Sequence, residues 1–179
     1  MVLRSYLGSA MHPLERVPLS QQKKTLALLL LFTLLVMLAM GLIDRELKTV
    51  FCPYGIISFE FVWSAARAAE VIDHWSEAAR IAAGFSLGLD YLFLPLYSTT
   101  LVAFLLFGAP QARWSRWLAW GQWLAALLDA IENLCLLLLL TREVNDGLAH
   151  TATICASVKF LLVVLGLLGV LFSRLIQRR

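Results

Sequence analysis

The chain has 179 residues, of which 60% are hydrophobic and only 15% are charged. A typical soluble domain is about 45–50% apolar and about 25% charged, so this composition argues against a soluble domain and favours a membrane protein. The net charge at neutral pH is +3. The basic residues flank apolar runs, as they do beside membrane spans, so we expect the lipid bilayer and no nucleic acid as a partner.

Four apolar runs follow one another, and each has about the 20 residues that a membrane-spanning helix needs. We expect a cytoplasmic N-terminal tail over 1–24, spans over about 25–43, 83–107, 117–140 and 150–172, and a basic cytoplasmic tail over 174–179. The first run is longer than the apolar core of about 7–15 residues in a cleaved signal, so we expect it to be retained. Short connections make the last three spans antiparallel neighbours. The sequence predicts an all-α integral membrane protein with one four-helix bundle domain over 25–173.

The outer loop over 44–82 carries a helical pattern of its own. From Ser58 to about Arg80, apolar residues recur on one side and polar residues on the other. This pattern predicts an amphipathic helix at the outer membrane interface. The polar side holds Glu60, Ser64, Arg67, Glu70 and His74.

Three residues of this loop form a weak candidate metal site. Glu70, His74 and Glu77 stand at i, i+4 and i+7, and this spacing can bring three ligands of a divalent ion to one face. A solvated face with a Glu70–His74 pair is the commoner cause of such a pattern. We therefore expect no bound metal here, and keep the three residues as candidates only.

The orientation follows from the distribution of charge. With both termini in the cytoplasm, the inner segments hold Lys and Arg with hardly an acid, while the outer loops are rich in acids. This is the positive-inside pattern. We therefore expect a plasma-membrane protein of the bacterial inner-membrane type.

Four ionisable side chains lie inside the expected spans: Asp90, Asp129, Glu132 and Lys159. A charge near the middle of a bilayer costs about 2.5–3.5 kcal/mol on insertion scales, so such residues normally face a bundle interior and have partners. At a rise of about 1.5 Å per residue, all four fall about 10–18 Å below the outer surface. We expect a buried polar cluster made of Asp90, Tyr97, Asp129, Glu132, Asn133 and Lys159.

The numbers of acidic and basic groups limit the states that this cluster can adopt. Its carboxyl groups outnumber its one base, so we expect a protonated acid, a bound cation or a wet crevice. Three interpretations stay open. The cluster can be an ion pair that fixes helix register, a site for a ligand, lipid or ion, or a catalytic pair of acid and base.

Motifs for several activities are missing from the sequence. There is no C-x-x-C, P-loop, H-E-x-x-H or G-x-S-x-G, so no cofactor is expected and the common hydrolase and redox chemistries lack their residues. Gly84 and Gly88 have the spacing of a close helix contact, and Gly166 lies on a similar small-residue face. These faces and the outer helix are candidate contacts for a homo-oligomer or a protein partner.

The leading hypothesis is a non-enzymatic envelope protein that binds a partner or a lipid. One alternative is a proton- or cation-coupled permease component with Asp90, Asp129 and Glu132 as carriers. The other is an intramembrane acid–base enzyme that acts on a lipid or isoprenoid.

Overall fold

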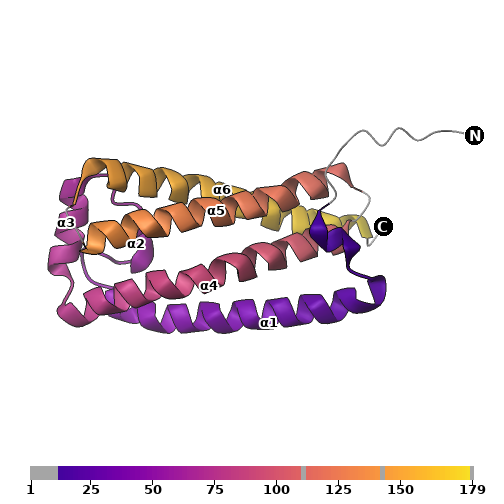
Figure 1. The fold of residues 1–179 in the computed structure, drawn as a ribbon, viewed down its shortest axis with the longest axis horizontal. Coiled ribbons are helices and arrows are strands. Elements are labelled where there is room, and N and C mark those ends of the chain that lie inside the picture. Colours follow the sequence, from indigo (N-terminus) through magenta and orange to yellow (C-terminus); the bar gives the residue numbers. More distant parts are fainter. Residues whose placement is uncertain (1–11, 110–111, 142–143, 178–179) are drawn as a thin grey trace, which may run out of the picture.

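Four long helices account for most of the chain. The computed structural model describes residues 12–109, 112–141 and 144–177, which contain no strand. Figure 1 shows the long helices side by side along the longest axis. All four are long and apolar enough to cross a membrane, so the sequence prediction is confirmed at this level. They are α1 (Leu19–Ile43), α4 (Glu77–Gly108), α5 (Arg113–Thr141) and α6 (Asp146–Gln177).

The helices pack around α4 and α5. Helix α5 packs against both α4 and α6, while α1 packs chiefly against α4 (Figure 1). Thr33 is the one buried residue of α1, and its Oγ1 lies 2.8 Å from Thr100 Oγ1 of α4. The other faces of α1 carry exposed leucines, which is the pattern of a helix surrounded by an apolar medium.

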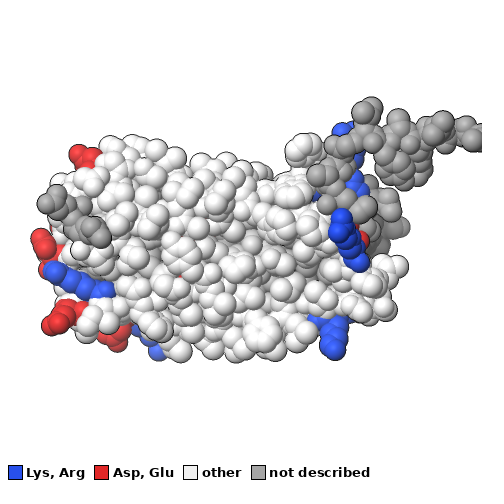
Figure 2. All heavy atoms as spheres, viewed as in Figure 1, with Lys and Arg blue, Asp and Glu red and all other residues white. Residues whose placement is uncertain are grey.

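Charged side chains gather at the two ends of the molecule. On the face in Figure 2, Asp and Glu lie mainly at the end that holds α3 (Ala65–His74), and Lys and Arg dominate the opposite end. The surface between them is uncharged. This distribution matches a molecule whose middle lies in hydrocarbon and whose ends meet water.

The segment between α1 and α4 is not the single helix expected over Ser58–Arg80, so the expected extent of that helix is wrong. It folds into a short 3-10 helix η2 (Asp44–Leu47), α2 (Ile56–Glu60) and α3, and α4 begins at Glu77. The breaks have local causes. Trp63 has a left-handed φ of 55°, and the side chains of Ser64 and Ser76 accept hydrogen bonds from backbone N–H groups of α3 and α4. Serine at such a position starts a new helix.

The helix ends also differ from the expected spans. Helix α1 begins at Leu19, inside the segment expected as a tail, and α6 reaches Gln177. Before α1, the 3-10 helix η1 (Pro13–Arg16) packs against α4, and its Glu15 Oε1 accepts a hydrogen bond of 2.7 Å from Arg116 Nε of α5. The His12 ring is fully buried, and the Trp123 ring centroid lies 4.3 Å away.

Candidate functional site

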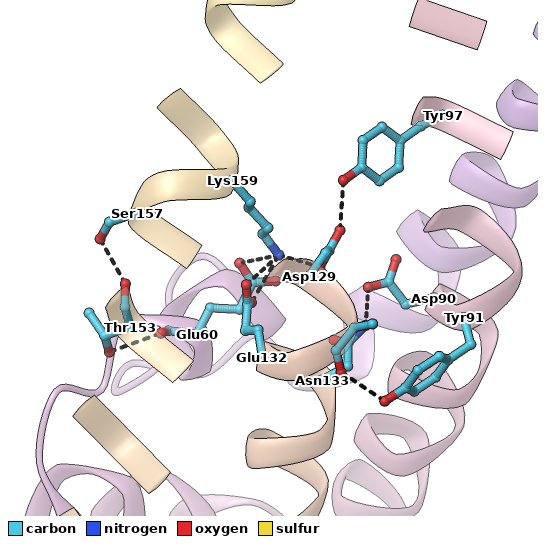
Figure 3. Close-up of polar contacts among 11 residues, drawn as sticks. Glu60, Asp90, Tyr91, Tyr97, Asp129, Glu132, Asn133, Thr153, Ser157 and Lys159 are labelled. Carbon is cyan, nitrogen blue, oxygen red and sulfur yellow. Dashed lines mark hydrogen bonds and ion pairs between the residues drawn. The ribbon is translucent and has the colours of Figure 1, made fainter. Parts of the chain in front are cut away.

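Lys159 of α6 is the centre of a buried charge cluster. Its Nζ lies 2.7 Å from Asp129 Oδ1 and 2.9 Å from Glu132 Oε1, both on α5. The Nζ also lies 3.6 Å from Glu60 Oε2 at the end of α2 (Figure 3). All four residues are buried. One lysine therefore faces three carboxyl groups away from water.

The helical repeat of α5 brings its polar residues to one face. Asp129, Glu132 and Asn133 stand at i, i+3 and i+4, so their side chains are neighbours on the helix surface. Because α5 packs between α4 and α6, Asp129 and Glu132 reach Lys159 on one side and Asn133 reaches α4 on the other. The structure thus brings together four of the residues expected to cluster.

The remaining two expected residues, Asp90 and Tyr97, come from α4. Asn133 Nδ2 donates a hydrogen bond of 2.5 Å to Asp90 Oδ2, and the Tyr97 hydroxyl donates one of 3.1 Å to Asp129 Oδ2. The other oxygen of Asp90, Oδ1, has no hydrogen-bond partner among the described residues. Asp90 is therefore held in place and keeps one acceptor open.

Glu60 is the member that sequence reasoning missed. The helical pattern places it on a solvated face, but the structure buries it to 8% exposure beside Lys159. Burial raises the pKa of Glu60 above its ordinary value, and the positive charge of Lys159 opposes this rise. One signal was present in the sequence: Phe59, Phe61 and Val62 flank this acid and make a solvated position less favourable.

A hydroxyl group on α6 holds the Glu60 backbone. Thr153 Oγ1 donates a hydrogen bond of 3.1 Å to the Glu60 carbonyl oxygen and accepts one of 3.1 Å from the Trp63 N–H. These two bonds tie the turn after α2 to α6. Glu60 therefore reaches Lys159 because α6 itself fixes the turn.

The cluster forms one end of a groove with a volume of about 720 Å³. Its walls come from α1, α4 and α6, and α2 contributes to the end beside the cluster. Several lining residues, such as Ile57, Leu167 and Leu171, are also exposed, so the groove is open at the side of the molecule. The walls are mostly apolar. The polar lining residues are Thr33, Glu60, Asp90, Tyr97, Thr100, Asp129 and Lys159.

A second cavity of about 390 Å³ adjoins the groove toward the basic end of the molecule. The two share the lining residues Phe104 and Val170. The second cavity is lined by Lys23 and Gln22 of α1 and by Ser173 of α6. The space beside α1 is thus polar at each end, and between the ends it is apolar apart from the paired hydroxyl groups of Thr33 and Thr100.

The candidate metal residues do not form a metal site. Arg67 pairs with the carboxylate of Glu70, and the His74 Nδ1 is hydrogen-bonded to the Glu70 carbonyl oxygen. Glu77 belongs to α4, after the break at Ser76, so the i+7 spacing no longer places it on the same helix. Across the described ranges, no group of three His, Cys, Asp or Glu residues is arranged to hold a metal ion.

The glycine faces differ in what they contact. Gly166 lies buried against the Gln122 side chain of α5, so this face is already occupied within the chain. Gly88 is exposed, and a Cβ there would meet nothing within 4 Å. Gly84 lies close to Leu140. Of these three glycines, only Gly88 has open space beside it.

The chain matches no protein-family model, no curated protein and no solved structure. The chemistry of the site therefore carries the functional argument. Lys159 is a charge partner of carboxylates, because its ammonium group contacts three of them. Asp90 and Glu60 present carboxyl oxygens to an apolar groove, and this arrangement is suited to binding a polar group attached to an apolar body.

Proposed function

We propose that the protein is a non-enzymatic membrane protein that binds an amphiphilic molecule in the groove between α1, α4 and α6. The observation that carries the proposal is the shape and chemistry of this groove. It combines about 720 Å³ of mostly apolar space with a buried charge cluster at one end. An apolar chain fits the walls, and a polar head group fits the cluster.

The proposed setting is the plasma membrane of the bacterial inner-membrane type. In this proposal the four long helices form an antiparallel bundle. Both termini lie in the cytoplasm, because the end that holds α3 is acidic and the opposite end is basic (Figure 2). In this orientation α2 and α3 lie on the outer side. The groove then opens sideways into the lipid, and its polar end lies in the outer half of the membrane.

Selectivity in such a groove comes from the polar end. An acyl chain gains little by leaving lipid for an apolar wall, because both surroundings are equally apolar. A head group gains more, because a hydrogen bond to a buried carboxyl group is strong in a medium of low dielectric constant. Membrane proteins also seldom retain buried charges without a use for them.

The groove favours a binding function over the two alternatives. The charged lining residues are concentrated at one end. Beyond them the wall is formed by residues such as Val163, Leu167 and Phe104, apart from the hydroxyl groups of Thr33 and Thr100, which bond to each other. A carrier of protons or cations needs polar groups along its whole path. An acid–base enzyme needs a free acid and base, whereas Lys159 already contacts three carboxyl groups.

Native mass spectrometry of protein extracted from its own membrane tests the proposal. Leu167 lines the groove. The neighbouring Leu168 is similarly exposed but does not line the groove, so Leu167→Trp and Leu168→Trp form a matched pair. We expect wild type and Leu168→Trp to carry the same small bound mass, and Leu167→Trp to lose it. Absence of a bound mass from wild type, or an equal mass on Leu167→Trp, would contradict the proposal. A protein partner seated in the groove would contradict it as well.

A further inference from the structure

We propose that the head group bound at the end of this groove is a protonated amine, and that Asp90 is the residue that receives it. This inference rests on the proposed function, because it names the chemical class of the amphiphile. It follows from the charge balance of the cluster, the open oxygen of Asp90 and the aromatic rings around it.

The charge balance of the groove leaves one acid without a cation. Lys159 is the one cationic side chain among the groove's lining residues. It lies within 4 Å of carboxyl oxygens of Asp129, Glu132 and Glu60, which leaves Asp90 as the carboxylate with no cation in contact. An unpaired buried carboxylate is costly in a low-dielectric medium, so a ligand that brings a positive charge gains the most there.

The position of Asp90 leaves one of its carboxyl oxygens open. Asp90 is only 8% exposed and lines the groove. Asn133 fixes its Oδ2, and Oδ1 has no hydrogen-bond partner among the described residues (Figure 3). Glu60 Oε2 is also buried without a hydrogen bond in the same end of the groove. The open positions are therefore acceptors on carboxyl groups.

Acceptor positions select a head group that donates. An ionised carboxylate only accepts hydrogen bonds, while a primary ammonium group offers three donors and a positive charge. A hydroxyl head group offers one donor and no charge. A phosphate or carboxylate head group carries negative charge and is repelled by the surplus of acids. Among common head groups, the amine is the best complement to Asp90 and Glu60.

Aromatic rings near Asp90 favour an organic cation over a metal ion. Phe93 and Tyr97 line the groove, and their ring centroids lie 5.1 Å apart. Phe160 also lines it, and its centroid lies 5.0 Å from Lys159 Nζ, so a cation already lies beside an aromatic ring here. Alkylammonium groups are attracted to aromatic faces. Hard metal ions instead require several oxygen ligands, and no group of three His, Cys, Asp or Glu residues in the described ranges is arranged to supply them.

Equilibrium binding to the full-length protein in lipid nanodiscs tests the inference. The probes are a long-chain primary amine, the alcohol of equal chain length and the sulfonate of equal chain length. The variants are Asp90→Asn and, as a matched control, Asp73→Asn, which removes an acid that is 78% exposed. We expect wild type and Asp73→Asn to bind the amine about tenfold more tightly than the alcohol, and the sulfonate least. Asp90→Asn is expected to bind amine and alcohol equally.

The outcomes separate this inference from the proposed function. Equal binding of amine and alcohol to wild type, still blocked by Leu167→Trp, would overturn the amine assignment and leave amphiphile binding in place. Failure of all three probes to bind wild type would overturn both. Displacement of the amine by sodium or potassium ions would reassign Asp90 to an inorganic cation and overturn the inference. Should Asp90→Asn not fold, the preference of wild type for the amine decides alone.

Discussion

Lys159 Nζ and Glu60 Oε2 lie 3.6 Å apart, although Glu60 belongs to the short segment between α1 and α4 and Lys159 lies in the middle of α6. This contact joins the segment that covers one end of the molecule to the polar end of the groove. The fold of α2 and the charge cluster therefore depend on each other. A change at either residue is expected to affect both the stability of the protein and the groove.

Removing the positive charge of the cluster should destabilise the protein strongly. In Lys159→Met, the carboxyl groups of Asp129 and Glu132 stay buried without a counter-charge, which typically costs about 3–5 kcal/mol. The control Lys48→Met removes an exposed pair with Asp44 and should cost at most about 1 kcal/mol. Unfolding by denaturant in mixed micelles measures both. Similar small losses in the two variants would show that the cluster does not stabilise the fold.

The titration of Glu60 should lower the free energy of unfolding as the pH rises. Burial raises its pKa above the ordinary value, against the attraction of Lys159 and together with the negative charge of Asp129. The interaction of Glu60 with Glu132 lowers this pKa and so opposes part of the rise. The folded state then holds this proton more tightly than the unfolded chain, so the free energy of unfolding falls between the ordinary pKa and the raised one.

The variant Glu60→Gln removes this titration. Its melting temperature should therefore fall less than that of wild type as the pH is raised above 4.5, the ordinary pKa of Glu60. Glu46→Gln removes an exposed acid of η2 and should behave as wild type does. Identical pH profiles for Glu60→Gln and wild type would show that Glu60 does not titrate in this way.

Thr153 should matter because it ties the turn after α2 to α6. Thr153→Val keeps the shape but removes both hydrogen bonds, to the Glu60 carbonyl oxygen and from the Trp63 N–H. Leaving these groups unpaired should cost about 1–3 kcal/mol. Thr151 bonds only within its helix and is exposed, so Thr151→Val should change stability by about 0.5 kcal/mol or less. Chemical denaturation of the two variants makes the comparison, and equal stabilities would contradict the role of Thr153.

The contact of α5 with α6 should depend on Gly166. A Cβ at this position would collide with the Gln122 side chain, whose Nε2 donates a hydrogen bond of 2.9 Å to the Leu162 carbonyl oxygen. Gly166→Ala should therefore cost about 1–3 kcal/mol. Gly88→Ala meets open space and should be neutral or stabilising by about 1 kcal/mol through helix propensity. Thermal melting of the pair tests this, and a stabilised Gly166→Ala would contradict the observed packing.

The sequence was informative where polar residues interrupt an apolar helix. Asp129, Glu132 and Asn133 were expected in a buried cluster, and the structure buries all three on one face of α5. A polar residue in hydrocarbon needs a partner, so its position identifies the inner side of the helix. The buried residues of that face are Gln122, Ala125, Asp129, Glu132, Asn133 and Leu136.

The sequence was not informative where the local pattern of residues does not show which side of a segment is buried. Helix α1 is apolar on all sides, so nothing in its sequence shows that it leaves a groove beside α6. Glu60 follows the same helical period as the partly exposed Glu70, and only the turn at Trp63 separates the two positions. The groove and the position of Glu60, the fifth charged residue of the cluster, therefore depend on packing between distant segments. The spacing of residues along one helix does not predict such packing.

Photochemical labelling tests the central claim, that the groove holds an amphiphile, most directly. The probe is a long-chain amine with a photoreactive group in its tail, added to the protein in nanodiscs and mapped by mass spectrometry. We expect an excess of unlabelled amine to suppress labelling at the groove residues Met37 and Leu167, and to leave labelling at the neighbouring Leu168 unchanged. Equal suppression at all three residues, or at none, would show that the probe contacts the protein only as bulk lipid does and would contradict the claim.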